Sequence, residues 1–482
     1  MKQHQRVIIL AAGKGKRMKS SLPKVLHEIS GQPMITHILK CVSETIPNAS
    51  VALVVGHERE KVEAAVRGSE YCAGMDITFI TQNEQKGTGH ATKRVIESAW
   101  GESLLSSRSA VLILPGDVPL ISNKLIREMI TPLRRGEVLR LLTCEFTDPT
   151  GYGRVVRRGK SGAVCRIVEE KDATSREKLI NETAVSIYYI QAQFLRFALD
   201  RLCDDNSQQE YYLTDILSQA VRTKRKIDVL KWSCAEDLHG INDLWELTKA
   251  NRVMNDRYLR ALAISGVRFV DPTSTWVDVT VKINEDVTVY PGAILKGKSG
   301  IGRGVIIGPN VLLRDVQVSA EANIKAGTVA EQSTIGEHSQ VGPYAHLRPG
   351  SSVGAGAKIG NFVELKKAVV GENSSIAHLS YLGDADIGKN VNIGCGFVTC
   401  NFDGRTVAGE RKHKTVIEDN VFMGSDCQVV APVRIGRGAY IASGSTITSD
   451  VEADALAIAR SRQVVKPGYA KKLRDGEGKD KI

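Results

Sequence analysis

The sequence lacks the features that mark secreted, membrane-spanning or disulfide-rich proteins. Its N-terminus, MKQHQRVIILAAG, has an apolar run too short to span a bilayer and no cleavage site of the signal-peptide kind. Nine cysteines, an odd number without CxxC spacing, argue against a disulfide framework and a structural zinc site. We therefore expect a cytoplasmic protein with reduced cysteines and no membrane association.

Aromatic residues are also scarce, at 5% of the chain. The net charge of +11 could suggest nucleic acid as a partner, but the basic residues are dispersed and no aromatic stacking platform accompanies them. Phosphorylated small molecules explain the charge as well. We expect no nucleic-acid partner.

The C-terminal half instead contains a ladder of aliphatic residues spaced six apart, between Ile283 and Ile447. The spacing is unbroken in two runs: Ile283, Val289, Leu295, Ile301, Ile307 and Leu313, and later Ile417, Met423, Val429, Ile435, Ile441 and Ile447. A period of six fits neither an amphipathic helix nor a single strand. It predicts a solenoid in which three six-residue sides close one coil and the aliphatic side chains stack inside.

The N-terminal half alternates apolar strands with helices. Strands are expected at Arg6–Leu10, Val51–Val55 and Ala110–Leu114, and helices at Pro33–Val42 and Ala91–Glu97. This alternation predicts a mostly parallel sheet that binds ligands at the carboxyl ends of its strands.

The chain therefore divides into four predicted segments. Residues 1–243 form the α/β domain, 244–265 a linker helix, 266–465 the solenoid, and 466–482 a basic tail. The tail lacks apolar periodicity, so we expect it to be disordered.

A glycine-rich loop follows the first predicted strand. It reads Ala11-Ala12-Gly13-Lys14-Gly15-Lys16-Arg17-Met18, with Leu22-Pro23-Lys24 after it. Glycines let backbone N–H groups approach phosphate oxygens, and the cations neutralise their charge. Neither a Walker A motif nor a dinucleotide fingerprint matches, and taken alone the loop could be an ordinary basic turn.

Further motifs follow in order: Gln82, Gly87-Thr88-Gly89-His90, Gly116-Asp117-Val118-Pro119-Leu120, Glu210-Tyr211-Tyr212-Leu213-Thr214-Asp215 and Gly240-Ile241-Asn242. With the loop, they resemble the sugar-nucleotide pyrophosphorylases, and most specifically the bifunctional N-acetylglucosamine-1-phosphate uridylyltransferase/glucosamine-1-phosphate acetyltransferase family. The resemblance runs from about Val7 to Gln463. It implies an α/β nucleotidyltransferase domain with a Rossmann-like mixed sheet, followed by an all-β left-handed parallel β-helix of hexapeptide repeats.

The resemblance also implies roles for residues of the first domain. The sugar phosphate attacks the α-phosphorus of UTP, with Arg17 and Lys24 as catalytic cations and Asp117 and Asn242 as Mg²⁺ ligands. Residues implied to bind UTP or UDP-N-acetylglucosamine are Leu10, Ala11, Ala12, Gly13, Lys24, Gln82, Gly87, Thr88, Pro115, Gly116, Asp117, Gly153, Glu169, Ala184 and Asn242. Within this set, Gln82, Gly87 and Thr88 would read uracil.

Two of these positions depart from the family pattern. Pro115 replaces a small or hydroxyl-bearing residue and removes a backbone donor. Ala184 stands where the family carries Asn, so one polar contact to the sugar nucleotide is missing unless Asn181 or Thr183 supplies it.

A second set of polar residues gathers in the C-terminal half of the aliphatic ladder, where the six-residue spacing is interrupted. An amine that attacks a thioester must lose a proton, and a histidine, whose pKa lies near neutral, suits the role of general base. His378 is the histidine at this place, and Glu364 could tune it. A lone histidine could equally be structural, but its surroundings resemble the acetyltransferase half of the same family. The resemblance assigns glucosamine 1-phosphate to Arg348, Lys366, Tyr381, Asn392 and Lys412, and acetyl-CoA to Cys395, Asn401, Phe402, Ser425, Ser443 and Arg460.

Residues 401–414 are longer than in typical relatives and would leave the solenoid to reach a neighbouring subunit. The family is trimeric, and each acetyltransferase site is shared between chains. We therefore expect a homotrimer.

The expected function is two-step synthesis of UDP-N-acetylglucosamine, a precursor of peptidoglycan and lipopolysaccharide. Acetyl-CoA acetylates glucosamine 1-phosphate, and UTP with Mg²⁺ then supplies the uridylyl group. Two alternatives remain open at this point. One is a nucleotidyltransferase of other base or sugar specificity with a regulatory solenoid, and the other is a solenoid scaffold whose nucleotide domain only senses a ligand.

Overall fold

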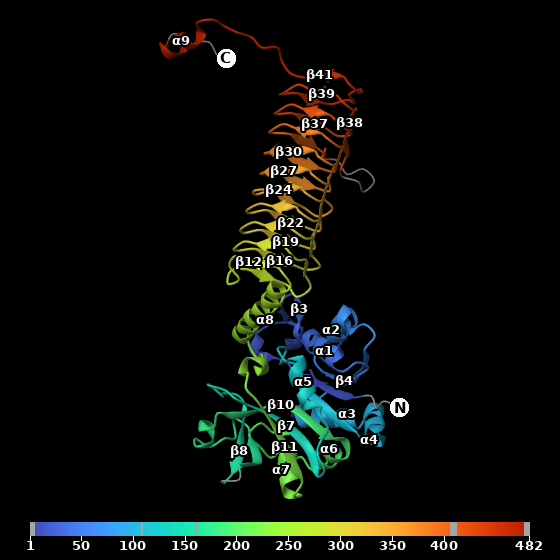
Figure 1. Cartoon of the computed structure of the whole chain (residues 1–482), viewed down its shortest axis with the longest axis vertical. Coiled ribbons are helices and arrows are strands. Elements are labelled where there is room, and N and C mark those ends of the chain that lie inside the picture. The colour runs from blue at the N-terminus through green and yellow to red at the C-terminus, as the bar shows by residue number, and fades with distance from the viewer. Residues whose placement is uncertain (1–4, 108, 160–161, 405–411, 477–482) are drawn as a thin grey trace. The chain divides into compact units, whose positions relative to one another are not determined.

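The structure is a computed structural model that describes residues 5–107, 109–159, 162–404 and 412–476 (Figure 1). It divides into two compact units, Met1–Arg257 and Tyr258–Ile482. Residues 405–411 of the long 401–414 segment and residues 477–482 of the tail lie outside the described residues. Within the described ranges, no helix has both the length and the apolar character needed to cross a bilayer.

The first unit is built on a nine-stranded mixed sheet, as expected. Its main path is β11-β7-β10-β6-β1-β4-β5, in which β10 runs antiparallel to β6 and β7. The strands are β1 (Arg6–Leu10), β4 (Ser50–Val55), β5 (Asp76–Thr81), β6 (Ala110–Pro115), β7 (Glu137–Glu145), β8 (Gly153–Arg158), β9 (Ala163–Val168), β10 (Glu182–Gln191) and β11 (Lys226–Trp232). Its longer helices are α1 (Met34–Thr45), α2 (Arg59–Arg67), α3 (Gly87–Ile96), α4 (Ala99–Ser106), α5 (Asn123–Met129), α6 (Ala192–Leu199) and α7 (Ile216–Arg222).

Helix α3 begins at Gly87, four residues before its predicted start. Two glycines weaken the helical pattern of the sequence, because glycine disfavours helix interiors. Their presence has a steric reason: a Cβ on Gly89 would lie 2.7 Å from the carbonyl oxygen of Tyr211. The segment around Tyr211 therefore approaches the first turn of α3 more closely than any side chain would permit.

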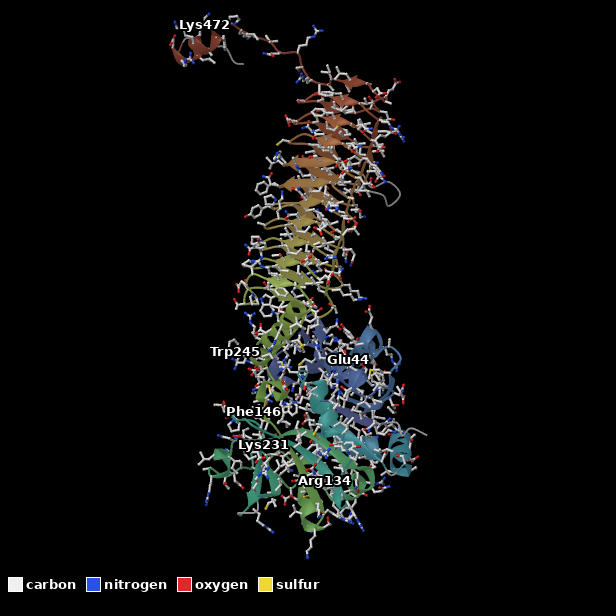
Figure 2. The ribbon with its side chains drawn as sticks, viewed as in Figure 1. Glu44, Arg134, Phe146, Lys231, Trp245 and Lys472 are labelled. Carbon is white, nitrogen blue, oxygen red and sulfur yellow. The ribbon has the colours of Figure 1, made fainter. Side chains whose placement is uncertain are left out.

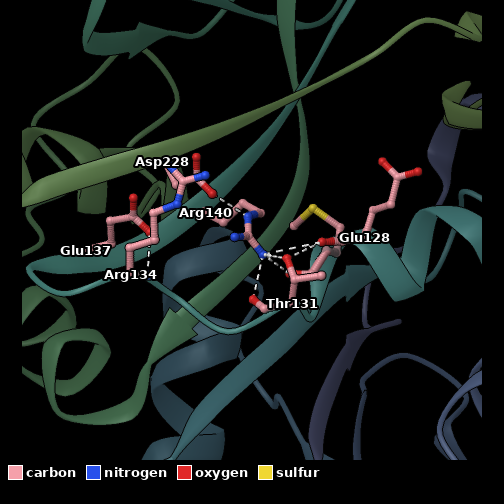
Figure 3. Close-up of polar contacts among 7 residues, drawn as sticks. Glu128, Thr131, Arg134, Glu137, Arg140 and Asp228 are labelled. Atoms are coloured by element: carbon pink, nitrogen blue, oxygen red, sulfur yellow. Dashed lines mark hydrogen bonds and ion pairs between the residues drawn. The ribbon is translucent and has the colours of Figure 1, made fainter.

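A buried arginine joins three elements of this unit (Figure 3). Arg140 of β7 donates from Nε to Asp228 of β11 at 2.5 Å, and from Nη1 to the carbonyl oxygens of Met129 at 2.8 Å and Thr131 at 2.7 Å. Its side chain is only 8% exposed. The guanidinium thus donates hydrogen bonds to carbonyl oxygens at the end of α5 that have no partner within the helix. Its ion pair with Asp228 also links the edge strand β11 to its neighbour β7.

The second unit is a left-handed parallel β-helix with three faces. One sheet runs from β12 (Arg268–Phe269) to β41 (Leu456–Ala457), a second from β13 (Trp276–Val277) to β40 (Thr446–Ile447), and a third from β14 (Lys282–Ile283) to β38 (Val433–Ile435). Figure 1 shows these short strands stacked coil upon coil. Helix α8 (Leu244–Ile264) precedes them, and the short helix α9 (Tyr469–Arg474) lies in the tail.

Strand register explains the hexapeptide ladder. Val289 pairs with Ile307, eighteen residues later, so three hexads make one coil. The aliphatic side chains point inward, and Val289, Leu295, Ile307 and Leu313 are fully buried. The predicted break also occurs: Ile387 pairs with Ile417, thirty residues later instead of about eighteen.

Candidate active sites

The glycine-rich loop opens onto a cavity of about 380 Å³ at the carboxyl ends of β1 and β6. Ten of the predicted nucleotide-binding residues line it: Leu10, Ala11, Ala12, Gly13, Lys24, Gln82, Gly87, Thr88, Pro115 and Asp117. They meet because Leu10 and Pro115 are paired neighbours on adjacent parallel strands. Gly116 permits this approach, since a Cβ there would lie 2.8 Å from the carbonyl oxygen of Leu10.

Lys24 stands between the two predicted metal ligands. Its Nζ forms an ion pair with Asp117 Oδ2 and donates to Asn242 Oδ1 at 2.9 Å. The Lys24 side chain is 11% exposed, so the ammonium is shielded from water. A carboxylate oxygen and an amide oxygen therefore converge on one cation, and both are ligand types that Mg²⁺ accepts.

The loops that carry these ligands are fixed to each other. The Ile241 N–H donates to the Asp117 carbonyl at 2.9 Å, and the Gly240 N–H donates to the Tyr152 hydroxyl at 3.0 Å. Asn242 itself receives support from Glu246, whose carboxylate accepts from its backbone N–H at 2.6 Å. Arg17, in contrast, lies exposed on the short 3-10 helix Lys16–Met18.

Three predicted sugar-binding residues adjoin one another beside this cavity. Ala184 of β10 is the strand partner of Gly153, and a Cβ on Gly153 would lie 3.5 Å from the carboxylate of Glu169. Glu169 accepts a hydrogen bond from the Thr214 hydroxyl at 2.9 Å. Burial raises the pKa of the Glu169 carboxyl above its usual value, although this hydrogen bond opposes the shift.

The sequence suggests Thr183 as one source of the polar contact missing at Ala184, but in the structure Ser186, and not Thr183, lines the cavity. Thr183 is fully buried and its hydroxyl already donates to the Cys144 carbonyl at 3.1 Å. Ser186, by contrast, lines the cavity and has a left-handed backbone with φ of 55°. It lies in a bulge of β10 between Ala184 and Tyr188, which no sequence pattern announces.

Gln82, predicted to read uracil, is held in place by α3. Its Nε2 donates to the Gly87 carbonyl at 3.1 Å and lies 3.1 Å from His90 Nδ1. The Gln82 side chain is buried, with 5% of the residue exposed. The cavity wall also includes Gln85 and Glu210, which the sequence motifs did not assign to ligand binding.

The second predicted site lies on consecutive coils of the β-helix. Glu364 and Lys366 lie on β28 (Glu364–Lys366), and His378 ends β30 (Ser375–His378). Tyr381 begins β31 (Tyr381–Gly383), and Asn392 begins β33 (Asn392–Ile393). Glu364 and Tyr381 are strand partners, as are Lys366 and Gly383. Arg348 follows β25 (His346–Leu347), one coil earlier.

The imidazole of His378 is hydrogen-bonded to an amide that the sequence analysis did not select. His378 Nδ1 lies 2.9 Å from Asn361 Oδ1, and the two residues are strand partners. Glu364 forms an ion pair with Arg348 at 3.0 Å. A tuning effect of Glu364 on His378 therefore stays a prediction, whereas the contact from Asn361 is direct.

Other predicted acetyltransferase residues also meet. Asn401 Nδ2 donates to Asp384 Oδ2 at 2.6 Å, and the Lys412 ammonium lies 5.3 Å from the Phe402 ring centre. Burial raises the pKa of the Tyr381 hydroxyl, while a hydrogen bond with Asn401 opposes the shift.

The four remaining acetyl-CoA positions are Cys395, Ser425, Ser443 and Arg460. Arg460 Nη1 donates to the Ser443 carbonyl at 2.8 Å. Ser425 is exposed and Cys395 is partly buried. On a single chain, the polar groups of this wall are partly or fully exposed, apart from the buried Asn401.

Known proteins resemble both units of the chain. Residues 7–156 match the family model of the MobA-like NTP transferase domain, and residues 332–367 and 414–449 match that of the bacterial transferase hexapeptide, six repeats. A relative named bifunctional protein GlmU from Geotalea uraniireducens is 44% identical over 96% of this chain and 98% of its own length. Proteins of the same name from Syntrophotalea carbinolica and Streptomyces avermitilis are 46% and 41% identical, with 95% of each relative covered.

Proposed function

The chain belongs to the GlmU family of bifunctional proteins, and from this premise we propose which of its residues carry each activity. It acetylates glucosamine 1-phosphate with acetyl-CoA and couples the N-acetylglucosamine 1-phosphate formed to UTP, releasing pyrophosphate. The product, UDP-N-acetylglucosamine, supplies peptidoglycan and lipopolysaccharide synthesis. This dual activity is favoured over a pyrophosphorylase with a purely regulatory solenoid.

Uridylyl transfer takes place in the cavity beside the glycine-rich loop. A phosphate oxygen of N-acetylglucosamine 1-phosphate attacks the α-phosphorus of UTP, and the bond to the β-phosphate oxygen breaks. Lys24, which lines the cavity, stabilises the developing negative charge on the reacting phosphates, and Arg17 approaches from the exposed 3-10 helix of the loop. Gln82, Gly87 and Thr88 line the part of the cavity that receives the base.

The transfer depends on Mg²⁺, and Asp117 and Asn242 suit that ion by the chemistry of their oxygens. When bound, Mg²⁺ supplies positive charge to the phosphate oxygens of UTP. Two protein ligands are few, and triphosphate oxygens and water would complete the coordination. Lys24, which now contacts both ligands, would then turn its ammonium toward the phosphates.

Acetyl transfer takes place on the β-helix wall around His378. The hydrogen bond from His378 Nδ1 to Asn361 leaves Nε2 free to accept a proton as the sugar amine attacks the thioester carbonyl. Collapse of the tetrahedral intermediate then breaks the carbon–sulfur bond and releases CoA. Arg348 and Lys366 provide cations for the sugar phosphate.

The observation that carries the uridylyl assignment is the convergence of Asp117 and Asn242 on Lys24. We expect Asp117→Ala to abolish uridylyl transfer and to leave acetylation intact, and His378→Ala to do the reverse. Each product is assayed separately, from glucosamine 1-phosphate with acetyl-CoA and from N-acetylglucosamine 1-phosphate with UTP. Loss of both activities in either variant, with the fold retained, would contradict the two-site assignment.

The working assembly is a homotrimer in which a second chain closes each acetyl site. The support is the openness of the wall: His378 and Arg460 are both exposed on a single chain, and bound CoA needs more enclosure than one face gives. Mixing inactive His378→Ala chains with inactive Arg460→Ala chains should restore some acetyltransferase activity. Absence of complementation, with mixed trimers shown to form, would place both residues in one chain's site.

The enzyme works in the cytoplasm. UTP and acetyl-CoA are available there, and all nine cysteines are free thiols, which suits a reducing compartment.

A further inference from the structure

A second cavity, of about 360 Å³, lies on the opposite side of helix α3 from the nucleotide cavity. Its lining residues are Lys86, Gly89, His90, Lys93, Arg94, Glu97, Leu199, Leu202 and Tyr211. They come from α3, from the end of α6 and the turn after it, and from the segment that precedes the 3-10 helix Leu213–Asp215. None of the nucleotide-binding or catalytic roles assigned above falls on a residue that lines this cavity.

One side of the cavity is basic. Lys86, Lys93 and Arg94 contribute three cations, and Glu97 is the one carboxylate among the residues that line it. Lys86 pairs with Glu84 at 2.5 Å and Arg94 with Glu97 at 3.2 Å. Lys93 forms no ion pair with any residue that the structure describes.

The other side of the cavity is apolar or aromatic. Leu199 is buried and Leu202 is partly buried, and the rings of His90 and Tyr211 lie 6.5 Å apart, tilted by 36°. Pockets of 300–1,000 Å³ that combine apolar walls with a few polar groups are typical of small-molecule sites. Cations in a recess attract anions more strongly than the same cations on a flat surface.

We propose that this cavity is a second ligand site that binds a small phosphorylated compound with a flat ring, such as a nucleoside monophosphate. The phosphate contacts Lys93 and Arg94 through charge-assisted hydrogen bonds, and the ring packs against Leu202 and Tyr211. The site itself does not depend on the roles of the two active sites, whereas its coupling to the nucleotide cavity rests on the proposed function of that cavity.

The two cavities share structural parts, so occupancy of one biases the other. His90 lines the second cavity, and its Nδ1 lies 3.1 Å from Nε2 of Gln82 in the nucleotide cavity. The Gly89 N–H donates to the Tyr211 carbonyl at 2.8 Å, and the neighbouring Glu210 lines the nucleotide cavity. A ligand that orders His90 and Tyr211 thus fixes the wall that holds uracil, and by linkage the uridine nucleotide affects the second ligand equally.

The binding test uses AMP, adenosine and inorganic phosphate as probes, by calorimetry with excess UDP-N-acetylglucosamine filling the nucleotide cavity. We expect saturable AMP binding, at least about tenfold tighter than that of adenosine or phosphate alone, because each probe retains only one half of the contacts. No saturable AMP binding would overturn the proposal. Phosphate binding as tightly as AMP would show an anion site without a ring subsite, which also contradicts it.

Variants locate the bound AMP. The double variant Lys93→Ala with Arg94→Ala should weaken AMP binding about tenfold or more. Lys124→Ala, an exposed lysine on α5 of the same unit, is the matched control and should leave it unchanged. Full AMP affinity in the double variant would place the binding elsewhere and refute the site. The coupling is tested by the affinity for UDP-N-acetylglucosamine with and without saturating AMP, and equal values would refute the link through His90.

Discussion

Asn361 gives the sharpest test of how the acetyl site works. Its side-chain oxygen lies 2.9 Å from His378 Nδ1. An amide oxygen only accepts hydrogen bonds, so the contact places the ring proton on Nδ1 and leaves the Nε2 lone pair for the substrate amine. Asn361→Ala removes this hydrogen bond, and with it the preference for a proton on Nδ1, while leaving His378 in place.

The expected loss follows from the energy of one hydrogen bond. A net contribution of about 0.5–1.5 kcal/mol corresponds to roughly 2- to 13-fold in kcat/KM for acetylation. Asn361 is a positioning residue, so the loss should appear in kcat, with little change in KM for either substrate. Release of CoA thiol from acetyl-CoA, followed with a chromogenic disulfide, measures both constants.

Two comparisons separate positioning from a general structural effect. Asn361→Asp keeps an acceptor and adds a negative charge, which favours the charged imidazole, so the acidic limb of the kcat/KM profile should move to higher pH. Asn323→Ala, on strand β21 (Asn323–Ile324) of the same sheet, is the matched control and should change neither constant. Unchanged acetylation in Asn361→Ala, or an equal loss in the control, would refute the role.

Three further predictions concern the uridylyltransferase unit. Ala184→Asn should strengthen UDP-N-acetylglucosamine binding severalfold, by about 0.5–1.5 kcal/mol, and no gain, measured by calorimetry, would indicate that Ser186 already supplies the contact. Arg140→Met should lower the free energy of unfolding in urea by about 1.5–3 kcal/mol. The loss is smaller than that of a fully buried ion pair, because the Asp228 side chain is 29% exposed. A measured loss below about 0.5 kcal/mol would be too small for the contacts in Figure 3. Because the pKa of Glu169 is raised, the folded state keeps the Glu169 proton to higher pH than the unfolded state does. The free energy of unfolding should therefore fall as pH rises from the usual carboxyl pKa through the raised one. In urea titrations at several pH values, Glu169→Gln should remove this pH dependence of stability, and a retained dependence would assign it to another group.

The β-helix could be read from the sequence because its determinants are local and periodic. Six-residue spacing alone fixes which side chains face inward, and the burial of Val289, Leu295 and Ile307 follows from it. The α/β unit was predictable for a similar reason, since short apolar strands such as Arg6–Leu10 alternate with helices. Family resemblance implied a mixed sheet, but not that β10 is the antiparallel strand, because strand direction depends on contacts far apart in the chain.

Contacts within the sites were harder to predict, because they depend on register and on irregular backbone. Glu364 attracted attention as a carboxylate near a histidine, whereas the structure gives it Arg348 as partner. Coil length would have identified Asn361: it precedes His378 by seventeen residues, close to one coil. Ser186 had no such signal, because the β10 bulge that turns it toward the cavity has no regular period.

Helix α3 shows how one short sequence can serve two cavities at once. Lys86, just before its start, and His90, Lys93, Arg94 and Glu97 within or after it follow the 3–4-residue spacing of one helix face, and all line the second cavity. Gly87, Thr88 and Ala91 fall between them and line the nucleotide cavity. A basic face of this kind would serve as well to keep a surface helix soluble. In this protein, however, the basic face borders a cavity whose other side is formed by Leu199, Leu202 and Tyr211. A role in ligand binding therefore explains the basic residues of α3 better than solubility alone does. A helix that separates two ligand cavities cannot shift for one without changing the other, and this rigidity is the physical reason to expect that the two ligands affect each other's binding.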